Sequence, residues 1–129
     1  MSRNYYSCII THGNLAHCLK GIAEKLVAPS VEVKSYSNLE LSLEEIEKQI
    51  REDIEKQKPE KIIIFVDLAG GSSCWFLAHR LKKGNEDVTV VAGVNVPLIV
   101  SYQMYIERLE WKDLIEKIVE DGKKGIITV

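Results

Sequence analysis

The sequence has no long hydrophobic run and no excess of positive charge. No apolar stretch approaches the roughly 20 residues that a membrane-spanning helix needs. The stretch after Arg3 is short and ends in polar residues, unlike a signal peptide. The formal net charge of -2 provides no basic field for counterion release, which argues against a nucleic-acid-binding protein. These absences predict a cytoplasmic protein without a nucleic-acid partner.

Cysteine is also scarce. Cys8, Cys18 and Cys74 are odd in number and form no CxxC pair, so neither a disulfide framework nor a zinc site is expected. We expect reduced thiols. What is present is ordinary for a globular protein: 46% of the 129 residues are hydrophobic and 28% are charged, enough for one domain, residues 1–129, with a real core.

Strand-like and helix-like segments alternate along the chain. Alternating or continuous apolar runs predict strands at residues 5–10, 31–36, 62–66 and 88–92, and a short last strand at 125–129. Helical spacing predicts a helix over 15–27 whose apolar face is Leu15, Leu19, Ile22, Ala23 and Leu26. Further helices are expected from Ser42 to Pro59, after Ser73, from Asn95, and around Trp111 to Val119, the last one stopped by Gly122.

This order predicts the α/β class, with an open parallel sheet covered by helices on both faces. The continuous β-branched run at 62–66 is typical of a central parallel strand. Right-handed crossovers then place the ends of the first, third and fourth strands at one edge of the sheet. In such sheets this edge binds ligands.

Two polar side chains, His12 and Asp67, follow strands that end at this edge. A carboxylate bonded to one imidazole nitrogen fixes the tautomer and leaves the other nitrogen free to act. The segment Gly70-Gly71-Ser72 adds glycines, amides at a helix start and a hydroxyl, which together suit an anion. The combination suggests a histidine that accepts a phosphoryl group, and nothing in it calls for a metal or a cofactor.

Three motifs in order carry a resemblance over essentially the whole chain. Ile10-Thr11-His12-Gly13, then Val66-Asp67-Leu68-Ala69-Gly70-Gly71-Ser72, then Ala92-Gly93-Val94-Asn95-Val96-Pro97 resemble enzyme IIA of the mannose-type sugar phosphotransferase system. The resemblance implies that His12 is the phosphoacceptor, that Asp67 orients it, and that Gly13, Gly71 and Ser72 help to bind the phosphate.

The resemblance also implies partners. In that family the small carrier HPr phosphorylates the histidine, which passes the group to a IIB subunit and so to a sugar entering through the membrane permease IIC/IID. The family is typically dimeric, with a C-terminal strand exchanged between subunits. We therefore expect an antiparallel fifth strand at Gly125 to Val129, exchanged in a homodimer.

The chain departs from the family pattern beside the aspartate. Ala69 and Ser73 stand where an aromatic residue and a proline are common, and Cys74 and Trp75 stand where small or polar residues are common. These four residues lie beside the proposed phosphate site, in the surface that would contact IIB. The sequence therefore does not identify the IIB partner or the sugar.

Several alternatives stay open at this point. The subunit that feeds dihydroxyacetone kinase would use the same histidine, and a phosphorylation-sensing regulatory module or a hydrolase using Cys74 and His12 belong to other classes. Asp67 could simply cap the next helix, and Cys74 is more simply a small core residue. His17 and His79 are expected to be solvated surface residues. A flavodoxin-like protein or a receiver domain is disfavoured by the first loop, which has neither a hydroxyl-rich phosphate loop nor an acidic cluster.

Overall fold

The sheet of the computed structural model, which describes residues 3–129, has four parallel strands in the order β2-β1-β3-β4. They are β1 (Tyr5–Thr11), β2 (Val33–Ser37), β3 (Lys61–Val66) and β4 (Val88–Ala92). The helices are α1 (Leu15–Leu26), α2 (Leu43–Gln57), α3 (Ser73–Lys82), α4 (Val96–Tyr105) and α5 (Trp111–Lys124). The predicted α/β class with a parallel sheet is confirmed.

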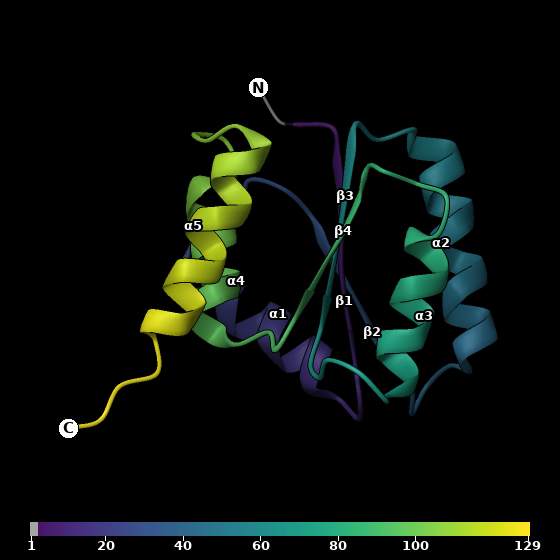
Figure 1. Cartoon of the computed structure of the whole chain (residues 1–129), viewed down its shortest axis with the longest axis horizontal. Coiled ribbons are helices and arrows are strands. Elements are labelled where there is room, and N and C mark those ends of the chain that lie inside the picture. Colours follow the sequence, from purple (N-terminus) through teal and green to yellow (C-terminus); the bar gives the residue numbers. More distant parts are fainter. Residues whose placement is uncertain (1–2) are drawn as a thin grey trace.

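Helices cover both faces of the sheet (Figure 1). α1, α4 and α5 lie on one face, where Phe65 contacts Tyr102 edge to face with ring centroids 5.2 Å apart. α2 and α3 lie on the other face, where Ile64 packs with Ile50 and Leu77 in a second core cluster. Because β3 is covered on both sides, residues 62–66 are all buried, as the continuous apolar run predicts.

The strand order places a topological switch point between β1 and β3. The chain runs from β1 to its neighbour β2 and then crosses to β3 on the other side of β1. In the register of this central pair Ile10 lies opposite Val66. The two strands therefore end at the same level, and their loops flank the crevice where ligands bind in such sheets.

α2 begins with a capping box, at the residue where the sequence predicts the helix to start. Ser42 Oγ accepts a hydrogen bond from the Glu45 amide, and the Glu45 carboxylate accepts one from the Ser42 amide. Both contacts satisfy backbone amides that would otherwise lack an acceptor at the helix start. The predicted start of this helix at Ser42 is confirmed.

The apolar face predicted for α1 is only partly correct. Leu19 and Ala23 are buried, but Leu15, Ile22 and Leu26 are exposed. The face that packs on the sheet instead includes Ala16, which is fully buried. A small residue such as Ala16 permits the helix to approach the sheet closely. The predicted face relied on large hydrophobic residues and therefore left Ala16 out.

The C-terminal region differs from expectation at two points. α5 continues through Gly122 to Lys124 instead of stopping at the glycine. A Cβ on Gly122 would lie 3.0 Å from Leu98 Cδ1, so the glycine serves the close packing of α5 on α4. Residues 126–129 form no strand in the single chain and are exposed, and the exchange predicted for them would require a second copy.

No helix within residues 3–129 has both the length and the apolar character required to cross a membrane.

Candidate functional site

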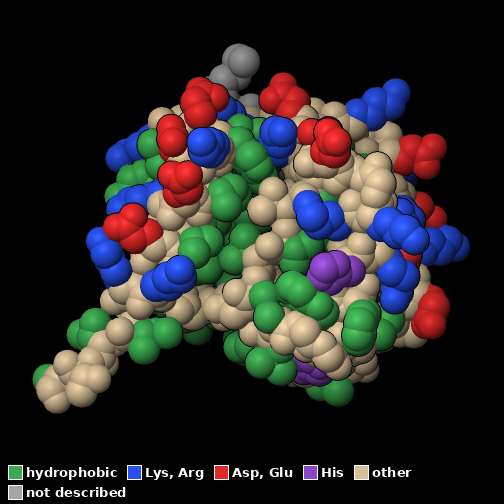
Figure 2. Space-filling view, in the orientation of Figure 1, with side chains coloured by type: hydrophobic (Ala, Val, Ile, Leu, Met, Phe, Trp, Pro, Cys, Tyr) green, Lys and Arg blue, Asp and Glu red, His purple; other side chains and the backbone are tan. Residues whose placement is uncertain are grey.

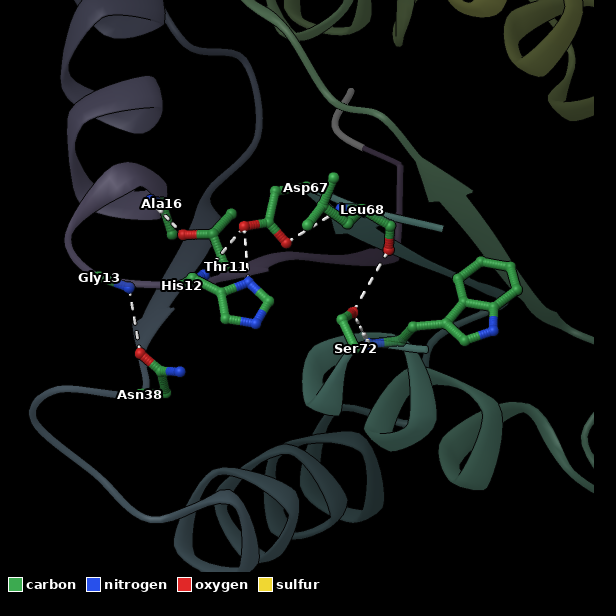
Figure 3. Close-up of polar contacts among 9 residues, drawn as sticks. Thr11, His12, Gly13, Ala16, Asn38, Asp67, Leu68 and Ser72 are labelled. Carbon is green, nitrogen blue, oxygen red and sulfur yellow. Dashed lines mark hydrogen bonds and ion pairs between the residues drawn. The ribbon is translucent and has the colours of Figure 1, made fainter. Parts of the chain in front are cut away.

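His12 and Asp67 meet at the carboxyl edge of the central strands (Figure 3). His12 directly follows β1 and Asp67 directly follows β3. Asp67 Oδ2 lies 2.9 Å from His12 Nδ1 and also accepts a hydrogen bond from the His12 amide at 3.0 Å. The side chain of His12 is 42% exposed, whereas that of Asp67 is 13% exposed. The imidazole is therefore open to solvent, and the largely buried Asp67 carboxylate holds its Nδ1 side in place.

The protonation of this pair follows from its contacts. Burial alone would raise the pKa of Asp67, but hydrogen bonds from the backbone and side chain of His12 outweigh it and lower the pKa below its ordinary value. An ionised carboxylate only accepts hydrogen bonds, so Nδ1 carries the proton that faces it. In the neutral ring, Nε2 then holds a free lone pair. This is the tautomer that a nucleophilic Nε2 requires.

The turn after β1 is held by contacts that the sequence did not reveal. Gly13 has φ +59°, a conformation that glycine adopts without strain. Its amide donates to Asn38 Oδ1 at 3.0 Å, and Thr11 Oγ1 accepts from the Ala16 amide at 2.7 Å (Figure 3). Asn38 belongs to the turn after β2, and no local pattern marks it, because its role depends on the pairing of β1 with β2.

The glycine-rich loop turns the chain from β3 into α3. Gly70 and Gly71 both have φ +65°. Ser72 is the N-cap of α3: its Oγ accepts from the Trp75 amide at 3.2 Å, while its own amide donates to the Gly70 carbonyl at 2.7 Å. Ser72 thus has partners within the chain, and the phosphate-binding roles of Gly13, Gly71 and Ser72 stay predictions.

Cys74 lies in the first turn of α3 and is fully buried. Burial, followed by the nearby Asp67 carboxylate, raises the pKa of its thiol to about 11. A thiol that stays protonated at neutral pH is a poor nucleophile, so the geometry gives no support to the cysteine hydrolase alternative. Its sulfur nevertheless lies next to the His12–Asp67 pair: Sγ and the ligand atoms of both residues are within 4.8 Å of one another.

The other two histidines differ from each other. His79 is exposed as expected and contacts Trp75 edge to face at 4.4 Å. His17 is not simply solvated, since its Nδ1 lies 2.6 Å from Ser35 Oγ and its Nε2 contacts Glu40. Both contacts join α1 to the edge strand β2 and the turn that follows it.

The third sequence motif is structural. Asn95 caps α4 by accepting from the Leu98 amide at 3.0 Å, and its Nδ2 donates to the Gly122 carbonyl at 3.0 Å. It therefore connects the start of α4 to the last turn of α5. The motif supports the fold beside the site and contributes no contact to His12 within the described chain.

Exposed hydrophobic side chains surround the edge that carries His12. They come from the starts of α1 and α3 and from the loops after β2 and β3, and they are Leu15, Leu39, Leu68 and Phe76. Figure 2 shows hydrophobic side chains gathered at the lower edge of the molecule, over the loop that leads into α3. Leu39 and Leu68 are 72% and 59% exposed, so neither side chain packs in the hydrophobic core.

Comparisons with known proteins agree with this architecture. The family model EIIA-man, described as PTS system fructose IIA component, matches residues 7–119. No curated protein matches the chain. Similar solved structures include the phosphotransferase system component EIIA from Streptococcus agalactiae, 18% identical with a TM-score of 0.83 over 96% of each chain.

Two further structures share the fold. The PTS IIA protein associated with the fucose utilization operon of Streptococcus pneumoniae is 23% identical, with a TM-score of 0.75 over 98% of this chain and 94% of that one. The mannose/sorbose specific IIA subunit from Enterococcus faecalis is 17% identical, with a TM-score of 0.75 over 100% of this chain and 96% of that one. At these identities the structural likeness establishes the fold alone.

Proposed function

The chain belongs to the EIIA-man family of the sugar phosphotransferase system, and we propose that it is a phosphoryl carrier whose acceptor atom is Nε2 of His12. Phospho-HPr donates the group, and phospho-His12 passes it to a IIB component for sugar uptake through a IIC/IID permease. The role places the protein in the cytoplasm. The observation that carries the proposal is the Nδ1 contact of the exposed His12 ring with Asp67.

The transfer step uses few groups. The Nε2 lone pair of His12 attacks the phosphorus, a P–N bond to Nε2 forms, and the bond from phosphorus to the donor atom of phospho-HPr breaks, with its electron pair left on that donor atom. The His12 ring keeps its proton on Nδ1 and becomes cationic, and the Asp67 carboxylate balances that charge at 2.9 Å. Little more than in-line approach and stabilisation of charge is required for such a transfer.

The start of α3 supports the charge on the transferred group. A helix N-terminus offers unpaired amides and a positive dipole end to an anion. Ser72 caps the Trp75 amide, which leaves the amides of Ser73 and Cys74 at the first two helical positions. The amide of Gly71 has no acceptor within the described chain. We assign these amides to the phosphate cradle. The amides of Gly13 and Ser72 donate to Asn38 and Gly70, so they would join the cradle only by exchanging those acceptors for phosphate oxygens.

The hydrophobic rim suits protein partners. Leu15, Leu39, Leu68 and Phe76 are exposed around the acceptor edge, and exposed apolar patches often mark protein–protein contacts. Both HPr and IIB must approach His12 closely, so both would dock on this rim in turn. Ala69, Ser73 and Trp75 lie on its α3 side and would influence the choice of IIB.

A homodimer is part of the proposal. Residues 126–129 extend away from the body at the lower left of Figure 1, with Ile126 and Ile127 at 79% and 75% exposure. β4 is an edge strand, and an uncovered edge pairs readily with another strand. The tail of one copy would pair antiparallel with β4 of another. Sedimentation of the full chain and of a chain ending at Lys124 tests this, since only the full chain should dimerise.

The carrier role is tested by incubation with phosphoenolpyruvate, enzyme I and HPr, followed by intact mass measurement at neutral and acid pH. The wild type should gain one acid-labile phosphoryl group. His12→Gln should gain none, whereas His79→Gln, which changes an exposed histidine of α3, should be labelled normally. Unlabelled wild type with competent phospho-HPr, or label retained in His12→Gln, contradicts the proposal.

The protein that takes the phosphoryl group from phospho-His12 distinguishes a transport carrier from a dihydroxyacetone kinase subunit and from a regulatory module. Phosphorylated protein is mixed with candidate IIB proteins and with dihydroxyacetone kinase subunits, and loss of the label is followed over time. Rapid transfer to a IIB protein supports transport. Rapid transfer to a kinase subunit would assign the chain to the dihydroxyacetone pathway, and a stable label with every acceptor would indicate a regulatory module.

A further inference from the structure

The fold places three metal-binding side chains together at the acceptor edge. Among residues 3–129, the ligand atoms of His12, Asp67 and Cys74 lie within 4.8 Å of one another. The spacing in the sequence gives no sign of this cluster, because the residues follow two strands that are distant in the chain and adjacent in the sheet. Cys74 is also one of the two positions, with Trp75, where the chain departs from the family's pattern of small or polar residues.

The donor set suits zinc. An imidazole, a carboxylate and a thiolate are the three ligand types that Zn²⁺ takes in proteins, and three protein ligands with one water form an open site. Zinc–ligand bonds of about 2.0–2.3 Å place tetrahedral donor atoms roughly 3–4 Å apart. The observed cluster needs only small side-chain shifts to reach this geometry. Entry is available from the side of His12, whose side chain is 42% exposed.

We propose that Zn²⁺ binds His12 Nδ1, the Asp67 carboxylate and Cys74 Sγ, and that the bound metal prevents phosphoryl acceptance by His12. The binding site is independent of the proposed function, whereas the inhibition rests on it. When zinc binds, the Cys74 thiol releases its proton to solvent as the Zn–S bond forms. Asp67 changes from a hydrogen-bond acceptor to a metal ligand.

Inhibition follows from the tautomer of the ring. In the metal-free site the proton is on Nδ1 and the lone pair is on Nε2. A metal on Nδ1 takes the lone pair of that nitrogen, so the neutral ring carries its proton on Nε2. Nε2 then has no lone pair to attack phosphorus. The metal therefore blocks the acceptor atom without touching it.

Binding is tested first without any phosphoryl donor. Zinc is titrated into the reduced full chain against a chromophoric chelator, and Co²⁺ is added in parallel to detect a thiolate-to-cobalt charge-transfer band. One zinc per chain and a charge-transfer band are expected. Cys74→Ser should lose the band and bind zinc at least about 10-fold more weakly, since even outer-shell changes cost about 10- to 100-fold in affinity. Cys18→Ser, which changes the exposed cysteine of α1, should behave as the wild type.

Absence of the band in the wild type, or zinc affinity unchanged in Cys74→Ser, would overturn the site. The band is measured on the wild type, so the result does not depend on how well a variant folds. A band lost in Cys18→Ser and kept in Cys74→Ser would place the metal on the wrong thiol and would also overturn it.

The effect on phosphorylation is measured with phospho-HPr purified away from enzyme I. Zinc should slow labelling of the wild type at least 10-fold near saturation, and a chelator should restore it. Cys74→Ser should slow by no more than about twofold at that zinc concentration, the effect that a site about 10-fold weaker allows. Equal wild-type rates with and without zinc would overturn the inhibition. No labelling even without zinc would instead contradict the carrier role, while the metal titration would still stand.

Discussion

Asp67 accepts hydrogen bonds from two nitrogen atoms of His12, the ring Nδ1 at 2.9 Å and the backbone amide at 3.0 Å. One carboxylate oxygen thus fixes the orientation of the imidazole and the path of the chain at the same residue. The other oxygen, Oδ1, accepts from the Leu68 amide at 3.0 Å. The carboxylate is held by its own loop, so it can orient the ring before any partner arrives.

Asp67→Asn should reduce the rate of phosphoryl transfer from phospho-HPr by about 100-fold or more, within the range that loss of a correctly oriented general base or tautomer costs. The amide can donate to Nδ1, which would move the ring proton to Nε2. Rapid-quench measurement of phosphohistidine formation checks the rate. Asp87→Asn removes an exposed carboxylate that pairs with Lys61 and should leave the rate within about twofold. Equal rates for the two variants would exclude an orienting role for Asp67.

The pH dependence of stability should report the same contact. The pKa of Asp67 is lower in the folded chain than the ordinary 3.8, so its ionised form stabilises the fold above the ordinary value. This contribution is lost as the pH falls through the lower, folded-state pKa. The difference in unfolding free energy between wild type and Asp67→Asn should be constant above about pH 5 and shrink below it. Urea titrations at several pH values check this, and a difference that grows toward acid pH would contradict the assignment.

Gly13→Ala and Gly21→Ala form a matched pair. A Cβ at either position meets no atom within 4 Å, so neither substitution causes a clash. Gly13 has φ +59°, and alanine there should lower the unfolding free energy by about 1–2 kcal/mol. Gly21 lies inside α1, and alanine there should raise it by about 1 kcal/mol. Thermal or urea unfolding gives both values, and the same sign for both variants would refute the backbone argument.

Ser7 and Tyr102 should behave as a coupled pair. Ser7 Oγ and Tyr102 OH lie 2.5 Å apart between β1 and α4, and both residues are buried. Tyr102→Phe or Ser7→Ala alone leaves one buried hydroxyl without its partner, which should cost about 1–3 kcal/mol. The double variant should cost less than the sum of the two single ones. Additive losses in urea unfolding would show that the two hydroxyls do not interact.

The central part of the fold could be predicted because local pattern and tertiary environment agree there. The run at 62–66 is β-branched or aromatic, and its burial on both faces needs no information beyond the sequence. His12 and Asp67 could be paired because parallel strands end at a common edge. The buried face of α1 and the end of α5 were predicted less accurately, since Ala16 and Gly122 act through the space they leave for neighbours.

The details of the site needed the tertiary structure. Asn38 binds the Gly13 amide only because β2 pairs with β1. Ser72 carried a signal that fits both a helix cap and a phosphate ligand, and the structure shows the capping contact. Cys74 is a small buried residue as predicted, but its nearness to His12 comes from the direction in which α3 leaves the glycine loop. These contacts between distant segments depend on the paths of the loops, which the residue types alone do not specify.

The pairing of β1 with β3 has a consequence for how the carrier responds to damage or heating. His12 and Asp67 are 55 residues apart in the chain, and the pairing of β1 with β3 brings them to within hydrogen-bond distance. Central strands are the last parts of a sheet to open in local unfolding. Fraying at the edge strands or at the tail would leave the acceptor intact, whereas separation of the central pair would remove it at once. The fraction of molecules that accept a phosphoryl group therefore measures how much of a preparation retains its innermost hydrogen-bonded core.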